Sequence, residues 1–142
     1  MFLLDTNVVS ELRKVGSGRE SKNVVMWANS VSAGDLYLSV VTVLELEQGI
    51  LLLARKDPVA AAILRKWMGA HVLPSFNARI LPVDASVALK CAALHVPHPR
   101  AERDCLISAT ALVHGMTVVT RTVDDFKNTG ATVLNPWEYA AD

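Results

Sequence analysis

The sequence predicts an α/β fold in which helices cover both faces of a parallel sheet. Two observations carry this prediction. Short apolar runs alternate with longer segments of helical periodicity, as in βαβ units. Of the 142 residues, 51% are hydrophobic, which suits a three-layer sandwich whose sheet is buried on both sides. Because no linker, repeat or low-complexity tract divides the chain, we expect a single domain over residues 1–142.

Five apolar runs are the expected strands, and helices are expected between them. The first run, residues 2–4, stops at Asp5, and Thr6 and Asn7 follow before a helix expected from about Val8. The other expected strands are residues 36–39, 79–83, 116–120 and 132–134. The other expected helices are residues 21–31, 41–55, 59–72 and 85–95, and a last one from Asp104 to a C-cap at Gly115.

The charge balance limits the ways in which the protein can contact nucleic acid. Fourteen Lys and Arg residues equal fourteen Asp and Glu residues, so a large basic surface that coats nucleic acid is excluded and any such contact is local. The longest run without a charged residue, 105–120, contains Ser108, His114 and Gly115 and is a poor membrane span. Asp5 and Glu11 interrupt the place of a secretion signal, so we expect a cytoplasmic protein without membrane contact.

The cysteines and two of the histidines carry no recognisable metal motif. Cys91 and Cys105 fall in expected helices without Cys-x-x-Cys or zinc spacing, which predicts buried, reduced thiols. His95 and His98 belong to a proline-broken tract, residues 95–100. They could suggest a metal, but without a paired cysteine motif or an HExxH motif a surface loop is the preferred interpretation.

Acidic residues recur at one predicted edge of the sheet. Asp5 follows the first strand, and Asp124 and Asp125 follow the fourth, while Glu45 and Asp104 stand near the starts of helices. In a doubly wound sheet these positions can meet where ligands bind. Carboxylates held close together repel unless a cation lies between them, and oxygen ligands suit Mg²⁺ or Mn²⁺. Such a site can hydrolyse phosphodiester bonds.

Each of these acids also has a simpler explanation. Asp5 can be only an N-cap, and Asp104 only a first-turn acid stabilised by the helix dipole. Glu45 lies one helical turn before Gly49, which would let a ligand or another backbone approach, whereas Glu47 points elsewhere. The simpler alternative makes both glutamates solvent-facing and Gly49 a packing notch.

Four motifs in register over nearly the whole chain resemble the PIN-domain ribonucleases, and most closely the VapC/FitB toxins of bacterial toxin–antitoxin pairs. They are LLDTNVVSEL, SVVTVLELEQG, ERDCLISATALVHG, and TRTVDDF followed by GATVLNPW. The resemblance implies a PIN domain with a five-stranded parallel sheet and the first strand central. It also implies a magnesium-dependent endoribonuclease, the toxin of a type II pair, that acts on single-stranded or looped RNA.

The resemblance places the family's acids on Asp5, Glu45, Asp104 and Asp125. Asp5 and Asp104 are then the principal metal ligands, Glu45 is a ligand or the general base, and Asp125 completes the shell. Asp124 adjoins Asp125, and Thr122 stands where similar proteins commonly have Asn, so the choice between the two aspartates stays open.

Four further residues are candidates for supporting roles around these acids. Thr6 and Asn7 could hold the carboxylates or a phosphate by hydrogen bonds. Arg103 and Arg121 flank the acids in sequence and are candidate phosphate contacts, although they could equally be ordinary surface arginines.

The resemblance also implies a homodimer and a small, often DNA-binding antitoxin of the VapB/FitA type. An extension of that antitoxin would fill the toxin's groove and insert a basic side chain among the acids. The apolar helices around Trp27 and residues 51–53 are the candidate surface, but a monomer that buries these residues fits the same sequence.

Two other functions are compatible with the fold. A phosphatase with a phosphorylated aspartate usually has a second acid two residues later, where this chain has Asn7, which counts against it. A binding module that has lost activity is disfavoured because all four acids are present.

Overall fold

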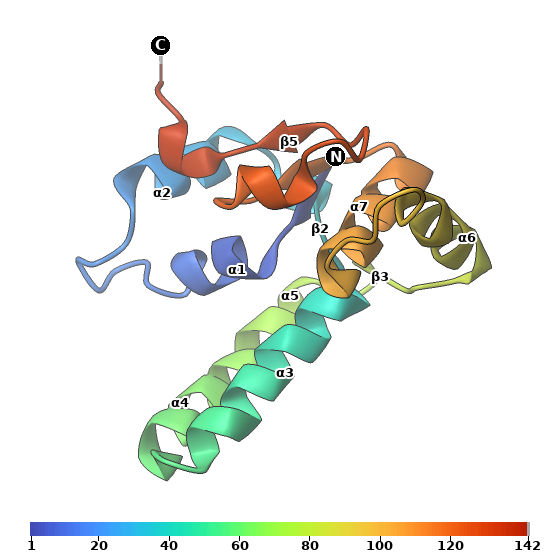
Figure 1. Cartoon of the computed structure of the whole chain (residues 1–142). Coiled ribbons are helices and arrows are strands. Elements are labelled where there is room, and N and C mark those ends of the chain that lie inside the picture. Colours follow the sequence, from blue (N-terminus) through green and yellow to red (C-terminus); the bar gives the residue numbers. More distant parts are fainter. Residues whose placement is uncertain (142) are drawn as a thin grey trace.

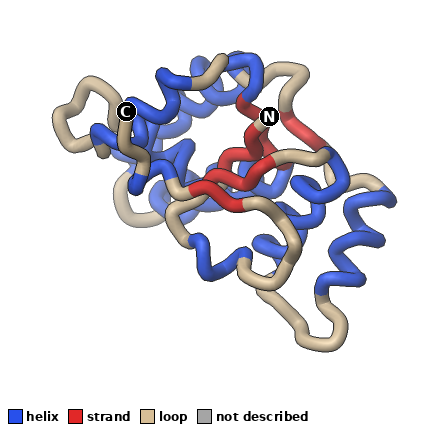
Figure 2. Tube along the Cα trace, turned by 90° about the horizontal axis from the view of Figure 1, so that it is seen from above, coloured by secondary structure: helices blue, strands red, loops and turns tan. Residues whose placement is uncertain are grey.

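Five parallel strands form the central sheet of the computed structural model, which describes residues 1–141. The strands are β1 (Phe2–Leu4), β2 (Leu36–Ser39), β3 (Ile80–Leu81), β4 (Thr117–Val119) and β5 (Val133–Leu134). Their order is β3-β2-β1-β4-β5, and every neighbouring pair is parallel. The strands lie in the middle of the fold with helices around them (Figures 1 and 2). The predicted parallel sheet with a central first strand is therefore confirmed.

Seven α-helices of the described chain connect and cover the strands. They are α1 (Thr6–Leu12), α2 (Lys22–Ser30), α3 (Val40–Ala54), α4 (Pro58–Trp67), α5 (Leu73–Ser75), α6 (Ala85–Leu94) and α7 (Glu102–His114). Ser21, Asp57 and Asp84 cap the starts of α2, α4 and α6, because each side chain accepts a backbone amide there. Gly115 takes a left-handed conformation after α7, so the expected C-cap is confirmed.

Four predicted boundaries were wrong. Helix α7 begins at Glu102, two residues before the expected Asp104. The other three differ for local reasons. Helix α1 begins at Thr6 rather than about Val8, because Asp5 itself caps it. Strand β3 spans two residues instead of 79–83, since Pro82 has no amide to donate to the sheet. The helix expected over 59–72 ends as α4 at Trp67 and continues as a π-helical turn over Met68–Val72.

Alternating strand residues build a core on each side of the sheet. On one side, Leu4 and Val119 pack with the helices α1 to α4, and Trp27 belongs to this core with 3% of its surface exposed. On the other side, Leu3 and Val118 pack with α7, and α6 packs against α7 further out. The three-layer prediction is confirmed, and Trp27 is a core residue rather than part of a docking surface.

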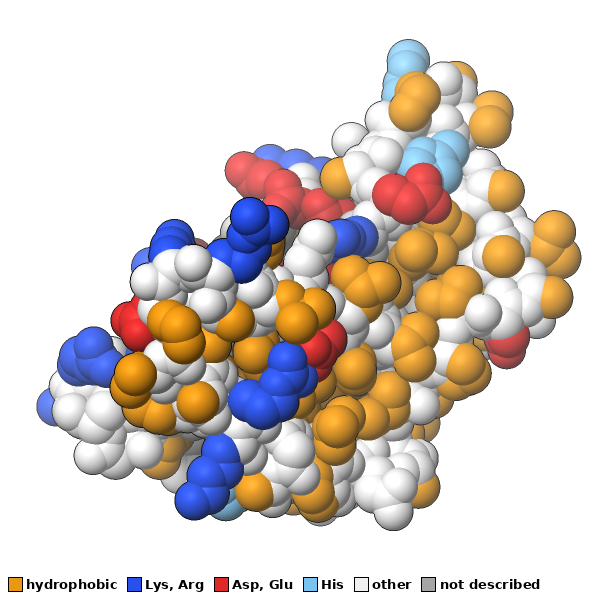
Figure 3. Space-filling view, turned by 90° about the horizontal axis from the view of Figure 1, so that it is seen from below, with side chains coloured by type: hydrophobic (Ala, Val, Ile, Leu, Met, Phe, Trp, Pro, Cys, Tyr) orange, Lys and Arg blue, Asp and Glu red, His pale blue; other side chains and the backbone are white. Residues whose placement is uncertain are grey.

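Helices α3 and α4 form a hairpin that extends away from the sheet (Figure 1). A bidentate ion pair between Glu47 and Arg65 joins the two helices. Apolar side chains remain exposed along the hairpin, and apolar atoms spread over the face shown in Figure 3. These exposed residues are Leu44, Leu51, Leu52, Val59 and Ile63.

Two further expectations concern membranes and the histidine tract. No helix within residues 1–141 has both the length and the apolar character that crossing a bilayer requires. His98 is exposed, as expected of a surface loop, but His95 is the half-buried C-cap of α6 and departs from that expectation.

We expect Leu38→Ala to lower the free energy of unfolding by about 2–5 kcal/mol, because this fully buried side chain fills the core beside β1. Leu52 on α3 is 60% exposed, so the matched change Leu52→Ala is expected to shift the free energy of unfolding by at most about 0.5 kcal/mol. Urea unfolding of both variants measures the difference, and equal effects would contradict this description of the core.

Candidate active site

The first acid of the site is held at the carboxyl end of the central strand. Asp5 donates its backbone amide to Val119 O over 2.9 Å, which continues the pairing of β1 with β4. Its Oδ1 accepts the Thr6 amide over 2.8 Å at the start of α1, and its Oδ2 accepts the Thr120 hydroxyl over 2.8 Å. Only 6% of Asp5 is exposed, so both oxygens lie in fixed positions in a largely buried setting.

Glu45 joins this group from α3. Its Oε1 accepts the Thr6 hydroxyl over 2.8 Å, and its Oε2 lies 3.8 Å from Nη1 of Arg103 on α7. A Cβ atom at Gly49, one turn further along α3, would meet no side chain or neighbouring element within 4 Å. Gly49 is therefore not a packing notch but borders open space beside Glu45.

The two remaining acids come from α7 and from the segment after β4. Asp104 is half-buried in the first turn of α7. Asp125 lies in a short 3₁₀ helix, Val123–Phe126, which the fully buried Phe126 anchors to the core. Asp124 points away, with 84% of its side chain exposed and its Oδ1 2.9 Å from Nζ of Lys127. Asp125, and not Asp124, is the aspartate beside the other acids.

The raised pKa values of two acids reflect the proximity of four carboxylates. Burial is the main cause that raises the pKa of Asp104 to about 6, and repulsion from Asp125, Asp5 and Glu45 adds to it. Burial also raises the pKa of Asp5, and repulsion from Glu45 and Asp125 adds to the increase. The hydrogen bonds that Asp5 accepts from Thr120 and Thr6 lower its pKa, but by less than burial raises it. The structure thus brings together the four acids from four separate segments.

Thr120 is the residue of this site that the sequence analysis did not single out. It is fully buried, and its hydroxyl donates to Asp5 while accepting the Asn7 side-chain amide over 3.3 Å and the Thr122 backbone amide over 3.1 Å. A polar residue at the end of an otherwise apolar strand was the available signal. Asn7 lies beside the acids, and its Oδ1 accepts the Arg121 amide over 3.3 Å, which ties α1 to the end of β4.

The two candidate phosphate-binding arginines lie on different sides of the acids. Arg103 faces Glu45, as described above. Arg121 places its guanidinium 5.2 Å from the centre of the Trp137 ring. Beside Arg121, an open cavity of about 400 Å³ is lined by Asp125, Asn135 and Glu138 among others. Positive charge and an aromatic face therefore border the acids at this end.

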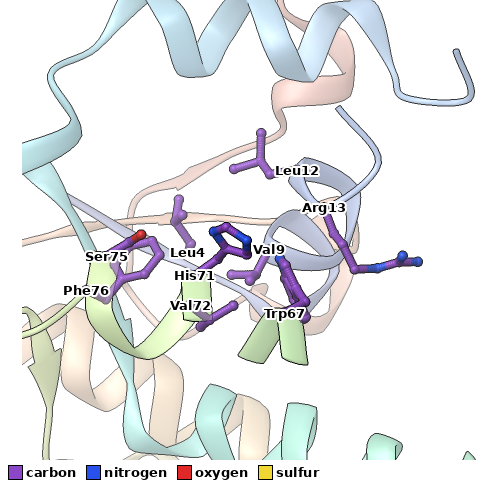
Figure 4. Close-up of a pocket in the computed structure, with 9 residues that line it drawn as sticks. All are labelled: Leu4, Val9, Leu12, Arg13, Trp67, His71, Val72, Ser75 and Phe76. Atoms are coloured by element: carbon purple, nitrogen blue, oxygen red, sulfur yellow. The ribbon is translucent and has the colours of Figure 1, made fainter. Parts of the chain in front are cut away.

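Two smaller cavities lie beside α1, one facing the α3–α4 hairpin and one facing residues 67–76. One of about 230 Å³ runs from Thr6 and Glu45 to Gly49 and Trp67. The second, of about 140 Å³, is shown in Figure 4, where Arg13 and Trp67 lie at one end and Phe76 at the other. Arg13 places its guanidinium 6.0 Å from the Trp67 ring centre and lines both cavities. The aromatic ring of Trp67 and the cationic Arg13 thus line both cavities, and the larger of the two reaches Glu45 of the acid cluster.

The sequence matches the PIN domain family over residues 2–131. The chain belongs to this family. The PIN domain found here is 37% identical over 142 residues to Toxin FitB of Neisseria gonorrhoeae, covering 96% of this chain and 99% of that protein. It is 35% identical over 145 residues to VapC ribonuclease Y4jK of Sinorhizobium fredii, covering 99% of this chain and all of that protein. It is also 37% identical over 147 residues to plasmid stability protein StbB of Pseudomonas syringae pv. tomato, covering 97% of this chain and 99% of that protein.

Solved structures resemble this PIN domain over the same length. The crystal structure of FitAcB from Neisseria gonorrhoeae contains a chain that is 36% identical, with a TM-score of 0.87 and coverage of 97% of this chain and 99% of that one. A structure of FitAB bound to an IR36 DNA fragment gives the same identity and TM-score, with 99% of each chain covered. The similarity therefore extends over the whole PIN domain.

The raised pKa of Asp104 predicts how the stability of the metal-free PIN domain depends on pH. An unfolded aspartate has a pKa of about 3.9, so between about pH 4 and 6 the folded state keeps a proton that the unfolded state releases, and stability falls as the pH rises. We expect Asp104→Asn to be more stable than the parent at neutral pH by about 1 kcal/mol, allowing for partial solvent exposure.

Urea unfolding in the presence of a chelator, at several pH values, measures this effect. The difference should shrink as the pH falls from about 6 to 4 and disappear near about pH 3, where Asp104 is protonated in both states. The exposed, lysine-paired Asp124 provides the control, since Asp124→Asn should give no such dependence. A constant difference between parent and Asp104→Asn at all pH values would contradict the assignment.

Proposed function

We propose that this PIN domain is the toxin of a type II toxin–antitoxin pair and a metal-dependent endoribonuclease. The observation that supports this most is the convergence of Asp5, Glu45, Asp104 and Asp125 from four separate segments. Mutual repulsion among these acids is destabilising, and such clusters persist where a cation offsets it. Close relatives named as a toxin and as a ribonuclease support the choice of RNA hydrolysis among the reactions of acid clusters.

The donor set fits a hard divalent cation. The four converging side chains offer only carboxylate oxygens, the ligands that Mg²⁺ and Mn²⁺ prefer. Asp5 and Asp104 would be the principal ligands, with Glu45 and Asp125 completing the shell. When bound, the ion supplies positive charge that offsets the negative charge developing on the phosphate during hydrolysis.

The protein's own groups orient the reactants. The Thr6 hydroxyl holds Oε1 of Glu45, which leaves Oε2 as the atom that can accept the proton of an attacking water. The Thr120 hydroxyl and the Thr6 amide fix both oxygens of Asp5. Arg103, close to Glu45, and Arg121 would bind phosphates of the RNA backbone on either side.

A single-stranded substrate suits the surfaces beside the acids. Unpaired nucleobases stack on aromatic rings and guanidinium groups, and both lie next to the acids as Arg121 with Trp137 and Arg13 with Trp67. The equal numbers of acidic and basic residues favour such local contacts over a broad electrostatic surface.

The proposed antitoxin would bind along the α3–α4 hairpin. Exposed Leu51, Leu52 and Ile63 offer apolar contacts there, and the cavity beside Gly49 leads from this hairpin to the acids. A basic side chain of the antitoxin inserted at Glu45 would compete with the cation. The FitAB–DNA structure supports an antitoxin of the VapB/FitA type that also binds DNA, and we propose that the toxin is a homodimer.

We expect Asp5→Asn and Asp104→Asn each to reduce RNA cleavage at least about 100-fold while the protein stays folded, since each removes a proposed ligand. Asp124→Asn, whose side chain faces Lys127, should retain cleavage within about twofold. Purified protein and structured RNAs are incubated with Mg²⁺, Mn²⁺ or a chelator, and the cut ends are mapped by sequencing.

The same assay separates the alternatives. Release of phosphate from small phosphoesters with intact RNA would favour the phosphatase. RNA cleavage and toxicity that Asp5→Asn leaves unchanged would indicate that these acids are not catalytic and would overturn the proposal.

We also expect Thr120→Val to weaken Mg²⁺ binding about 10- to 100-fold, because the valine leaves Oδ2 of Asp5 without its hydrogen bond. Thr110→Val is a matched control, since the fully buried Thr110 hydroxyl donates to Leu106 O over 2.7 Å within α7 and bonds to none of the four acids. Each change should lower stability by about 1–3 kcal/mol in urea unfolding. Isothermal titration with Mg²⁺ should distinguish them, and equal affinities would contradict the role of Thr120.

A further inference from the structure

A second group of metal-ligating side chains lies between α6 and α7. Cys91 and His95 are one turn apart at the end of α6, and Cys105 faces them from α7. One ligand atom from each of the three lies within 4.8 Å of the others. Glu102, one turn before Cys105, places Oε1 3.8 Å from Cys91 Sγ and Oε2 3.3 Å from His95 Nε2. We call these four residues the thiol cluster.

The thiol cluster contains one buried polar atom without a partner among residues 1–141. The Cys105 thiol donates to Cys91 O over 3.5 Å, and the Cys91 thiol donates to Oε1 of Glu102 over 3.8 Å. Cys91 and Cys105 are 3% and 1% exposed and form no disulfide. The His95 Nε2 atom is buried and has no hydrogen-bond partner in the described chain, because the geometry of its approach to Glu102 does not form one. An unsatisfied buried nitrogen is costly, and a ligand at this position would satisfy it.

We propose that Cys91, His95, Cys105 and Glu102 bind a borderline-soft divalent cation of the Zn²⁺ class. Ligand bonds of zinc measure about 2.3 Å to sulfur and 2.0–2.2 Å to nitrogen or oxygen. At tetrahedral angles these lengths separate sulfur from oxygen by about 3.6 Å and nitrogen from oxygen by about 3.4 Å. The separations of Glu102 from Cys91 and His95, 3.8 Å and 3.3 Å, are close to these values. The ligand atoms of Cys91, His95 and Cys105, which lie within 4.8 Å of one another, would move together by up to about 1 Å on binding.

The spacing of the four residues explains why the sequence analysis did not find this site. The ligands form the pattern Cys-x-x-x-His followed by Glu-x-x-Cys, and each pair lies on one face of its helix. Neither pair matches a familiar zinc motif, and only the packing of α6 against α7 brings them together. His95 was expected in a surface loop, but Arg100 holds that loop against the protein through bonds to Leu94 O and Asn128 O.

Binding requires defined proton movements. The two thiols each lose a proton to solvent and become thiolates, while Glu102 contributes a carboxylate. His95 Nδ1 accepts the Arg100 amide over 3.1 Å, so the ring proton resides on Nε2. On cation binding this proton moves to Nδ1, and the Arg100 amide loses that bond. The ring therefore changes tautomer, which is itself an observable sign of binding.

This site differs in chemistry and place from the acid cluster. Sulfur and nitrogen ligands select softer cations than carboxylates do. Asp104 and Cys105 are consecutive on α7 but face different neighbours, Asp104 the other acids and Cys105 the helix α6. A cation in the thiol cluster would clamp the first turn of α7, on which Asp104 stands, to α6.

Titration of the reduced full-length protein with Co²⁺ tests the proposal. Since the chain has two cysteines, any thiolate-to-cobalt charge-transfer band must come from Cys91 or Cys105. We expect such a band with tetrahedral visible absorption, saturation at one Co²⁺ per chain, and displacement by Zn²⁺. Zn²⁺ at a hundredfold excess over its Kd should raise the Tm by about 8 °C.

Matched variants locate the ion. Cys91→Ser, Cys105→Ser and His95→Asn should lose or shift the band, whereas His98→Asn, at an exposed position of the same loop, should keep it. Asp5→Asn should also keep it, which separates this site from the proposed nuclease site. A folded, reduced parent protein that gives no band overturns the proposal, as does saturation at half an ion per chain. Both outcomes are read on the parent and do not depend on how the variants fold.

Discussion

The placement of one buried carboxylate governs the arrangement of the whole acid site. Asp5 has lost most of its contact with water, and burial makes its ionised form costly. Two hydrogen bonds offset part of that cost, one from the first amide of α1 and one from the Thr120 hydroxyl at the end of β4. The charge at the end of β1 therefore depends on the pairing of β1 with β4 and on the start of α1.

The sheet and its helices bring the other acids to this point. Parallel neighbours end at the same edge, so the segments after β1 and β4 emerge side by side. Phe126 fills the core and fixes the 3₁₀ turn, which leaves Asp125 near the acids and Asp124 in solvent. Position in the fold, rather than residue type, distinguishes two adjacent aspartates.

Helix α7 contributes to both proposed metal sites of the molecule. Asp104 belongs to a set of hard oxygen ligands, and the next residue, Cys105, belongs to a set dominated by sulfur. Their side chains point to different sides because successive residues on a helix differ by about 100°. A structural cation between α6 and α7 would restrict movement of the turn that carries Asp104, and in this way would support the proposed catalytic site.

The sequence by itself determined the parallel α/β class and the strands that form it, because apolar runs and capping residues are local signals. Through its resemblance to the PIN-domain ribonucleases, the sequence also indicated Asp5, Glu45 and Asp104 as site residues. It left Asp124 and Asp125 undecided, and it gave no reason to pair Cys91 with Cys105 or to attach weight to Thr120. Tertiary structure decided these points. Thr120 and Asp5 are 115 residues apart in sequence but form a hydrogen bond, and Cys91 and Cys105 meet where two helices pack. Such contacts arise from the packing of distant segments, so no local sequence pattern predicts them.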